Sequence, residues 1–380
     1  MKEGWEYKKL GDYIKEYSDR DKGRGFPVYS VTNTRGFCQE FFGKNVASED
    51  TTNYKVVPRG CFAYNPSRIN VGSVAWQDQE DNVSVSPLYV VFSVSPELRQ
   101  DYLLYYIKSN YAMTYINALA RGAVRNNLRL STLKEFDIPF GPLDEQKQIV
   151  SELDLLSGVM EKQKAQLEEL DRLAQSIFYD MFGDPVTNEK GWEVKIIKDI
   201  CKVITGNTPS RNNLKYYNED YIEWIKTDNI ERDSLYPSVA KEYLSEEGAK
   251  QGRTADVGSI LIACIAGSLV SIGKCCLLNR KVSFNQQINA LVPKEEMNSL
   301  FVYSLVNAIA GYIRENTTNG MKHIITKSVL EEIRICVPPL SLQQEFATKV
   351  EAIEAMKAKV RLSLKEAETL FNERMDYYFN

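Results

Sequence analysis

Histidine is almost absent from this sequence, which contains one, His323, in 380 residues. The chain therefore has no histidine cluster for metal binding or triad chemistry. The segment GSLVSIGKC, from Gly267 to Cys275, resembles a phosphate loop. Its glycines are separated by five residues instead of four, however, and cysteine stands where serine or threonine would bind magnesium. We expect no catalytic site in this chain, and no cofactor or metal bound by it.

Cysteine is also scarce, and its pattern is not that of a disulfide protein. The seven cysteines are Cys38, Cys61, Cys201, Cys264, Cys275, Cys276 and Cys336. Their number is odd and no two are spaced as Cys-x-x-Cys, which argues against a disulfide framework and against a zinc knuckle. We interpret them as buried, reduced thiols of a cytoplasmic protein.

Long apolar runs and a net positive charge are missing as well. No apolar stretch reaches the roughly 18 residues of a membrane-spanning helix, and the first residues, MKEGWEYKKL, lack the apolar core of a signal peptide. The chain has 47 Lys and Arg against 51 Asp and Glu, a net charge of −4. We therefore expect no strong non-specific attraction to nucleic acid from this chain alone.

The most informative feature that is present is an internal repeat. GWEYKKLGDY begins at Gly4, and GWEVKIIKDI begins at Gly191. STLKEFDIPFGPL (131–143) corresponds to SVLEEIRICVPPL (328–340), and this alignment continues without a gap to the last residues. The two copies are therefore 187 to 197 residues apart in the sequence. A period that long indicates a duplicated domain and not a solenoid. Each half is one variable unit followed by one shared tail, with boundaries at 1–141, 142–183, 184–338 and 339–380.

Each shared tail is predicted to be one long helix. Apolar residues recur in alternate steps of four and three, which is typical of a coiled-coil seam. The seam positions are Ile149, Leu153, Leu156, Met160, Leu167, Leu170 and Ile177 in the first tail and Phe346, Val350, Ile353, Val360, Leu364 and Phe371 in the second. We expect the two helices to pack on each other; two ordinary amphipathic core helices are the alternative. Lys357 and Arg374 fall on the second seam and leave its register open.

The helix ends carry capping signals. Asp144 and Ser341 follow Pro-Leu pairs and are the N-cap candidates. Gly183 is expected to terminate the first helix. About 38 residues at 1.5 Å each make a rod of roughly 57 Å, the length of about 17 base pairs of duplex. Helices of this length would hold the two variable units far apart.

Acidic residues are missing from four windows that occupy corresponding places in the two halves. The windows are bounded by Asp50 and Asp78, by Asp101 and Glu135, by Asp256 and Glu295, and by Glu315 and Glu331. They contain Arg, Lys, Asn and Gln, the side chains that position phosphates and read base edges in DNA. Partly buried strands that exclude acidic residues for packing reasons are the alternative.

Together these features resemble the specificity subunit of type I restriction–modification systems, over the whole chain. The resemblance rests on the paired GWE-x-K starts, on YNPSRINVGSVA, on TGNTPSRNN with YIEWIKTDNI, and on the two helices that end in SIFYDMF and NERMDYYF. It implies an α+β fold with two α/β target-recognition domains of mixed sheet and helices, residues 1–141 and 184–338. Two long antiparallel coiled-coil helices would separate these domains, with an internal pseudo-twofold repeat.

The resemblance also implies a DNA reader without chemistry of its own. Each domain would read one half of a bipartite, interrupted site in double-stranded DNA. Two methyltransferase subunits would dock on the helices and methylate adenine with S-adenosylmethionine. Restriction and translocase subunits, with ATP and magnesium, would join for cleavage. No membrane is involved in such a complex.

The resemblance and the acid-free windows together suggest three DNA-contacting regions in each half. In the first half the candidates are Asn33 and Arg35, then Tyr64, Asn65, Ser67 and Arg68, then Arg121, Arg125 and Arg129. In the second half they are Thr208, Ser210 and Arg211, then Lys226, Thr227, Asn229, Asn285, Gln286 and Gln287, then Lys322 and Lys327.

Two other interpretations stay open at the level of sequence. A scaffold with two domains and a coiled coil, binding proteins instead of DNA, would have the same fold. The chain could also be the recognition half split from a fused methyltransferase–nuclease, although a complete pair of terminal helices argues against truncation.

Overall fold

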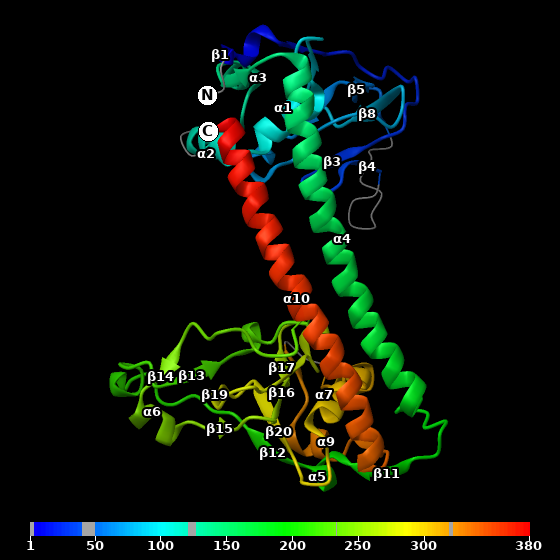
Figure 1. The fold of residues 1–380 in the computed structure, drawn as a ribbon, viewed down its shortest axis with the longest axis vertical. Helices are drawn as coiled ribbons and strands as arrows, with labels where there is room; N and C mark the ends of the chain where they lie inside the picture. Colours follow the sequence, from blue (N-terminus) through cyan, green and yellow to red (C-terminus); the bar gives the residue numbers. More distant parts are fainter. Residues whose placement is uncertain (1–3, 40–49, 121–126, 233, 319–321) are drawn as a thin grey trace. The chain divides into compact units, whose positions relative to one another are not determined.

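The computed structural model describes residues 4–39, 50–120, 127–232, 234–318 and 322–380 (Figure 1). Its contacts divide the chain into two compact units. The first consists of Met1–Ala165 with Arg361–Asn380, and the second of Gln166–Val360. Each unit therefore combines one α/β domain with part of each long helix, although a linear division of the sequence assigns the helices to separate segments.

The α/β domain of the first unit is built on an antiparallel four-stranded sheet. Its order is β2 (Ile14–Glu16), β9 (Val90–Val94), β6 (Phe62–Tyr64) and β7 (Val74–Trp76). Two-stranded ribbons join β1 (Glu6–Lys9) to β10 (Asp137–Phe140), β3 (Ser30–Thr32) to β4 (Gly36–Cys38), and β5 (Lys55–Pro58) to β8 (Asn82–Val85). The helices are α1 (Gln100–Lys108), α2 (Asn110–Ala120) and α3 (Leu130–Lys134). Helix α1 buries Tyr102, Leu103, Tyr106 and Ile107, which are spaced to line one face.

The second unit contains a matching antiparallel sheet and one further sheet. The matching sheet has the order β12 (Cys201–Thr205), β20 (Ile288–Pro293), β16 (Ile260–Ala263) and β18 (Cys275–Leu277). The further sheet has the order β14 (Tyr243–Leu244), β13 (Ile222–Ile225), β19 (Val282–Phe284) and β15 (Thr254–Ala255), with β13 and β19 parallel. Ribbons join β11 (Glu193–Ile196) to β22 (Arg334–Val337) and β17 (Ile265–Ala266) to β21 (His323–Ile324). The helices are α5 (Ile197–Ile200), α6 (Glu246–Gln251), α7 (Ser299–Ala308), α8 (Ala310–Glu315) and α9 (Lys327–Glu331).

The sequence repeat is confirmed as a structural repeat. Each GWE segment leads into a strand, β1 or β11, that pairs antiparallel with the strand just before a long helix. The two four-stranded sheets have the same order and direction of strands. Gly60 and Gly258 form equivalent turns ahead of β6 and β16, and both have φ of 84°. This left-handed conformation favours glycine, which explains why glycine recurs at this place.

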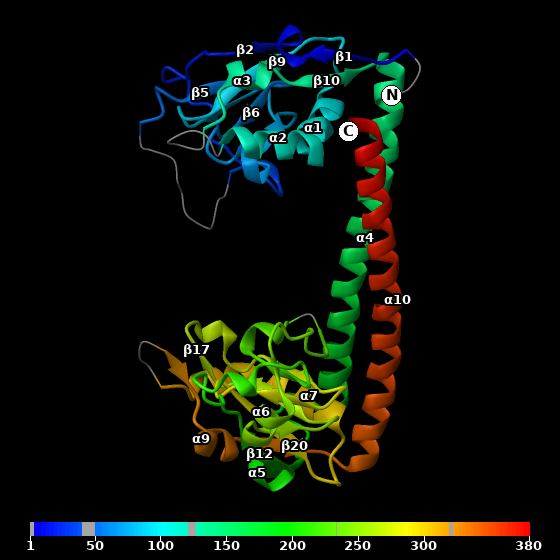
Figure 2. The same cartoon turned by 90° about the vertical axis from the view of Figure 1, so that its left-hand side faces the viewer.

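Two 40-residue helices, α4 (Leu143–Phe182) and α10 (Leu340–Phe379), lie side by side (Figures 1 and 2). They are antiparallel, because Glu152 near the start of α4 contacts Arg374 near the end of α10. Every seam position predicted from the sequence is buried or half-buried. Leu155, which lies between seam positions, is 72% exposed. Burial of apolar side chains along the two helices thus follows the 3.5-residue period of the seam, and apolar residues off the seam can remain exposed.

The starts of both helices differ from the prediction. Asp144 and Ser341 were expected as N-caps, but α4 and α10 begin at Leu143 and Leu340, so both side chains lie in the first turn. The backbone carbonyls of Pro142 and Pro339 accept the first helical hydrogen bonds instead. Proline lacks a backbone N–H but keeps its carbonyl, so it can accept these bonds from the position directly before the helix. Gly183, with φ of 73°, follows α4 as predicted.

The ends of the long helices are anchored in two separate hydrophobic cores. In the first unit, Leu153 of α4 and Phe379 of α10 belong to the core that also contains the strands of the β2-β9-β6-β7 sheet. In the second unit, Phe178 of α4 and Phe346 of α10 occupy the corresponding core. Burial of such side chains contributes about 1.5–3 kcal/mol each. The helices are therefore integral to the two domains and are not appended to them.

The two charged residues on the second seam are paired across it. Lys357, 4% exposed, places its Nζ 2.6 Å from both Asp171 Oδ1 and Glu354 Oε1. Arg374 Nη2 donates to Glu152 Oε2 at 3.0 Å. A shifted register would separate the buried Lys357 from Asp171 and Arg374 from Glu152, so such a shift is disfavoured. The register that the sequence left open is thus defined by ion pairs.

Candidate nucleic-acid interface

In the first unit, two of the predicted regions flank a single loop, residues 64–73. The backbone N–H of Leu128 donates to the carbonyl of Pro66 at 3.1 Å. On the other side of the loop, the Ser73 hydroxyl donates to the carbonyl of Val31 at 2.8 Å. The loop therefore joins the β3–β4 hairpin to the segment that precedes α3, and the three regions form one surface.

The polar side chains of this surface are mostly accessible. The exposed candidates are Asn33, Arg35, Ser67, Arg68 and Arg129. Asn65 is half-buried, and its Oδ1 accepts a hydrogen bond from the backbone N–H of Ser67 at 3.0 Å, which forms an Asx-turn. Arg121 and Arg125 lie outside the residues that the structure describes.

Tyr64 does not belong to this surface, and its assignment as a DNA contact is corrected. Its side chain is fully buried, and its hydroxyl donates to the carbonyl of Leu128 at 3.1 Å. Burial also raises the pKa of this phenol well above its usual value. Tyr64 therefore holds the loop against the segment before α3, and its place on a strand of the core sheet explains why it cannot face DNA.

A basic loop in the first unit was missed by the sequence analysis. Residues 19–26, DRDKGRGF, present the exposed side chains of Lys22 and Arg24. The loop is built around Asp21, which is fully buried and accepts hydrogen bonds from the Ser84 hydroxyl at 2.7 Å and from the backbone N–H of Gly25 at 3.0 Å. The alternation of basic residues with glycine was the available signal.

We expect Asp21→Asn to destabilise the first unit at neutral pH and to have little effect in acid. Burial alone would raise the pKa of Asp21, but its hydrogen bonds to Ser84 and to the loop backbone lower it below the ordinary value of 3.8. The carboxylate therefore contributes stability above the unfolded pKa, and that contribution is lost as pH falls through the lower, folded pKa. The expected cost at pH 7 is about 2 kcal/mol. Thermal unfolding of both proteins between pH 7 and pH 3 measures it, and a difference that grows in acid would contradict this account.

In the second unit, the predicted regions meet where β12 ends beside β19. Gly206 donates its N–H to the carbonyl of Ile288 at 3.0 Å, and a Cβ on Gly206 would lie 2.1 Å from the carbonyl oxygen of Asn285. This close approach requires glycine. Beyond it, the Thr208 hydroxyl donates to the side-chain oxygen of Gln286. Thr208 and Gln286 are both exposed, and they form a polar pair at the edge of the domain.

Beside this pair lies a group of two cations and two aromatic rings. The guanidinium of Arg211 lies 4.5 Å from the ring centroid of Tyr217 and 4.8 Å from that of Trp224. The ammonium of Lys226 lies 5.0 Å from the Trp224 centroid. Both cations bind Glu242, and the hydrogen bond from Lys226, together with that from Arg211, lowers the pKa of this carboxyl. Tyr217, Trp224 and Glu242 were not predicted, because only the fold brings them beside Arg211.

Two further candidates in this unit are corrected. Asn229 is 7% exposed, and its Oδ1 accepts from the backbone N–H of Lys226 at 3.0 Å. Asn285 is 6% exposed, and its Oδ1 accepts from the backbone N–H of Gln287 at 3.0 Å. Both amides shape backbone turns and do not face solvent. Asn side chains stabilise turns by hydrogen bonds to the backbone as readily as they bind DNA bases. The sequence alone therefore did not distinguish a turn-forming Asn from a base-contacting one.

The remaining candidates of the second unit vary in accessibility. Ser210, Lys322 and Lys327 are exposed, whereas Thr227 and Gln287 are half-buried. The Nζ of Lys327 lies 3.5 Å from the Oε1 of Glu331, and both residues are on α9. Strand β21 pairs with β17, just as the Leu128 segment is tied to the loop after β6 in the first unit. The third predicted region is therefore joined to the strand end in both copies.

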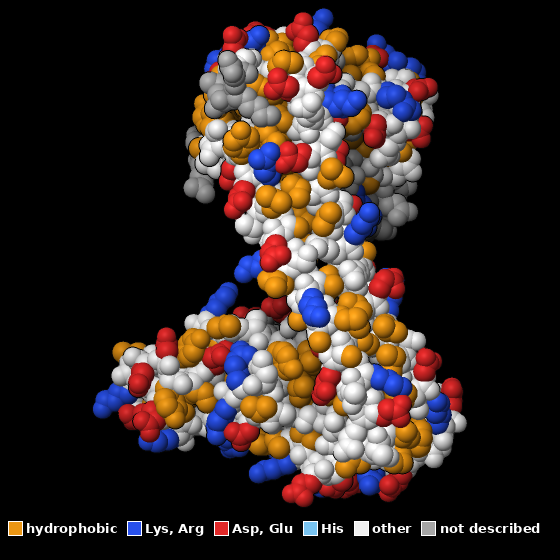
Figure 3. Space-filling view, in the orientation of Figure 1, with side chains coloured by type: hydrophobic (Ala, Val, Ile, Leu, Met, Phe, Trp, Pro, Cys, Tyr) orange, Lys and Arg blue, Asp and Glu red, His pale blue; other side chains and the backbone are white. Residues whose placement is uncertain are grey.

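Charge is mixed over the face shown in Figure 3. Lys and Arg side chains are interspersed with Asp and Glu, and no broad basic area covers either unit on this face. This distribution agrees with the net charge of −4. None of the helices in the described part of the chain is both long enough and apolar enough to cross a membrane.

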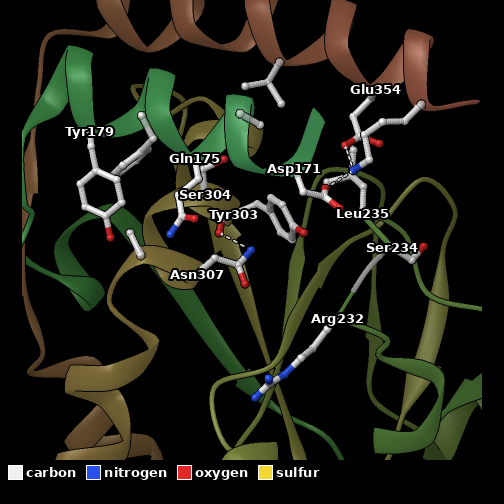
Figure 4. Close-up of a pocket in the computed structure, with 15 residues that line it drawn as sticks. Asp171, Gln175, Tyr179, Arg232, Ser234, Leu235, Tyr303, Ser304, Asn307 and Glu354 are labelled. Carbon is white, nitrogen blue, oxygen red and sulfur yellow. Dashed lines mark hydrogen bonds and ion pairs between the residues drawn. The ribbon is translucent and has the colours of Figure 1, made fainter. Parts of the chain in front are cut away.

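One cavity of about 290 Å³ lies in the second unit, between α4, α7 and α10 (Figure 4). Asp171 and Gln175 line it from α4, Tyr303 and Asn307 from α7, and Glu354 from α10. Asp171 and Glu354 are already engaged by Lys357. Among the described residues, no group of three or more His, Cys, Asp or Glu side chains could hold a metal ion.

The duplicated architecture is matched by a family model. The model for the type I restriction modification DNA specificity domain matches residues 2–171 and 189–366. The chain belongs to this family. The two matched copies of the specificity domain correspond to the two GWE-initiated repeats, and together they include most of both long helices.

Curated relatives and a solved structure resemble this specificity-domain chain. It is 26% identical over 169 residues to the type I restriction enzyme HindI specificity subunit of Haemophilus influenzae, covering 43% of this chain and 36% of that subunit. It is 28% identical over 164 residues to the MjaIX specificity subunit of Methanocaldococcus jannaschii, covering 42% and 37%. The alignments thus span little more than a third of these relatives. A chain solved in work on complex assembly and conformational transition of the type I R-M system has the same fold, with a TM-score of 0.60 at 18% identity over 100% of this chain and 98% of that one.

Proposed function

We propose that this chain is the DNA sequence-recognition subunit of a type I restriction–modification complex. Each α/β domain reads one half of a bipartite, interrupted site in double-stranded DNA, and partner subunits methylate adenine or cleave. The observation that carries this proposal is that the two copies share one sheet but continue with different residues at equivalent strand ends. The loop after β6 begins Asn-Pro-Ser-Arg, whereas the chain after β16 continues Cys-Ile-Ala-Gly. Two different half-sites are expected from two such different surfaces.

Exposed apolar residues outside the seam support docking of two identical partners. Val159 and Met356 are equivalent in the repeat, and so are Leu173 and Leu370. All four are exposed, by 44%, 46%, 45% and 45% respectively. An apolar position that stays exposed in both copies indicates a contact made twice. We assign these positions to two methyltransferase subunits, one on each copy.

The chemistry is assigned to the partners. Burial raises the pKa of Cys201, Cys264 and Cys276 to about 12, so these thiols are protonated and unreactive at neutral pH. In this proposal S-adenosylmethionine binds the methyltransferase subunits, while ATP and magnesium serve the restriction and translocase subunits in the cytoplasm. This chain supplies binding and orientation only.

A binding experiment separates this function from that of a protein scaffold. The full chain is purified with its methyltransferase subunit, and binding to duplex DNA is followed by gel shift at increasing salt. We expect a complex whose affinity falls steeply with salt, because phosphates are neutralised on binding. A stable protein complex that binds no duplex at low salt would favour the scaffold.

Shortening both helices by one heptad is expected to shorten the gap between the two half-sites. Deleting residues 161–167 and 361–367 keeps the seam in phase, since each deletion is seven residues. It also retains the Asp171–Lys357 and Glu152–Arg374 pairs. Each helix becomes about 10.5 Å shorter, which corresponds to roughly three base pairs. Sequencing of the methylated sites reads the gap directly.

The matched control deletes residues 161–167 alone. This variant leaves α10 seven residues longer than its partner, so the ion pairs at the two ends cannot form together, and loss of methylation is expected. An unchanged gap in the double deletion would show that the helices do not set the spacing.

A further inference from the structure

The contacts of Glu242 differ from those of an ordinary ion pair. Its carboxylate binds two cations from different segments: Arg211, in the loop after β12, and Lys226, directly after β13. The Arg211 Nη2 lies 2.5 Å from Glu242 Oε2, and Lys226 binds Oε1. One carboxylate thus satisfies two cations, and the group retains one positive charge.

The two cations contact rings whose own hydrogen bonds do not involve the Glu242 carboxylate. The Trp224 Nε1 donates to the carbonyl of Asn207 at 3.3 Å, and the Tyr217 hydroxyl donates to the carbonyl of Pro209 at 2.6 Å. The rings contact each other edge to face, with centroids 6.1 Å apart. Arg211 therefore has a fixed aromatic support against which its guanidinium can stay when its acidic partner changes.

A second glutamate in the same domain shows what a structural pair looks like here. Glu223 receives two hydrogen bonds from Arg280, at 2.6 and 2.8 Å, and one from the backbone N–H of Ala240. Its side chain is 15% exposed, against 38% for Glu242. Arg211 is 52% exposed. The pair of Glu242 and Arg211 is therefore more open to solvent than the pair of Glu223 and Arg280, and ion pairs in such places are weak enough for another anion to compete.

We propose that Arg211 and Lys226 form a binding site for a nucleic-acid phosphate, and that Glu242 occupies this site in the free chain. This inference rests on the proposed function of DNA recognition. A phosphate offers the oxygen geometry that an arginine fork binds in two-point fashion, and it carries charge enough to engage the lysine as well. Binding of DNA then releases Glu242, while the two cations remain on the Trp224 and Tyr217 rings.

Glu242 in this role weakens binding to every sequence, because each duplex must displace it. The free energy needed to displace Glu242 lowers the affinity most on DNA sequences whose bases make no compensating contact with the protein. Thr208 and Gln286, the exposed polar pair beside Arg211, are placed to supply such contacts on the correct sequence. The site thereby reduces non-specific binding and raises the ratio of specific to non-specific affinity.

The test compares Glu242→Gln with the unaltered full chain, both in complex with the methyltransferase subunit. Binding to a duplex of about 30 base pairs of arbitrary sequence is measured at several salt concentrations. We expect Glu242→Gln to bind about fivefold more tightly, the factor that corresponds to one exposed ion pair. In an Arg211→Gln, Lys226→Gln background the same substitution should have no effect, because the site is gone.

Glu247→Gln is the matched control, since it removes the same charge from an exposed position on α6. It should change affinity less than about twofold in either background. A gain from Glu242→Gln that persists without Arg211 and Lys226 would mean a general charge effect and would overturn the inference. A loss of affinity for duplex in a folded Glu242→Gln protein would also overturn the inference. If Glu242→Gln does not fold, Glu242→Ala is used in its place.

A second measurement keeps this inference distinct from the function on which it rests. Inorganic phosphate at millimolar concentration should raise the melting temperature of Glu242→Gln more than that of the unaltered chain, and should not raise it when Arg211 and Lys226 are also replaced. If no protein binds duplex but phosphate still shows this pattern, the anion site stands and the DNA-recognition proposal fails. Absence of the phosphate effect in a chain that binds duplex would reject the site.

Discussion

Gly206→Ala is expected to destabilise the second recognition domain strongly while leaving the first intact. The added Cβ would lie 2.1 Å from the carbonyl oxygen of Asn285, 2.6 Å from the Phe284 ring and 2.6 Å from its carbonyl oxygen. Two of these three contacts are with backbone, so no side-chain rotation relieves them. The strand end and the Asn285 turn must separate, at a cost of at least about 3 kcal/mol.

The measurement for this substitution is hydrogen exchange, resolved by segment, with DNA methylation as the functional readout. Exchange should rise across β12, β19 and β20 and stay unchanged in residues 50–120. Gly267→Ala is the matched control, because Gly267 has no atom within 4 Å of its Cβ position and no left-handed φ. Normal protection of β12 in Gly206→Ala would show that the close approach is not required.

Gln343→Leu is expected to detach the start of α10 from the second domain. Gln343 is 1% exposed, its Oε1 accepts from the backbone N–H of Asn298 at 2.9 Å, and its Nε2 donates to the carbonyl of Pro338 at 2.8 Å. Leucine has a similar size but leaves both backbone groups buried without a partner. Each unsatisfied group costs about 1–3 kcal/mol, so a total loss of about 2–6 kcal/mol is expected.

The repeat supplies a second test of the same interaction. Gln146, the equivalent residue of α4, is fully buried and binds the N–H of Arg99 at 3.0 Å and the carbonyl of Gly141 at 2.8 Å. Gln146→Leu should therefore destabilise the first unit as Gln343→Leu destabilises the second. Gln344→Leu, at an exposed neighbouring position, is the control and should be close to neutral. Equal effects of Gln343→Leu and Gln344→Leu in thermal unfolding would contradict the role given to the buried amide.

Periodic and repeated features were the parts of the fold that the sequence predicted well. The seam of α4 and α10 follows from a 3.5-residue apolar period that short-range spacing makes visible. The GWE starts and Gly60 and Gly258 lie at matching turns because the two copies have the same backbone conformation at these places. The pairing of Gln146 and Gln343 with loops about 45 residues away along the chain had only one sequence signal, their equivalent place in the repeat.

The candidate interface was predicted less well, for a physical reason. Polar residues near strand ends either face solvent or complete the hydrogen bonds of the turn that follows, and composition does not distinguish these uses. Tyr64, Asn229 and Asn285 proved to be of the second kind. Arg211 and Lys226 were found by their charge, but Glu242, which binds both, is 31 and 16 residues away in sequence. Such a pairing becomes visible only when the strands are placed.

The central claim, that this chain selects a two-part DNA site for methylation, is tested most directly by single-molecule sequencing. The chain and its methyltransferase subunit are expressed together in a host without DNA methylation, and the genome is sequenced with and without this chain. We predict N6-methyladenine in one interrupted motif whose two halves differ, and no such motif when the chain is left out. A soluble complex that produces no methylation, or a motif that persists without the chain, would contradict the account.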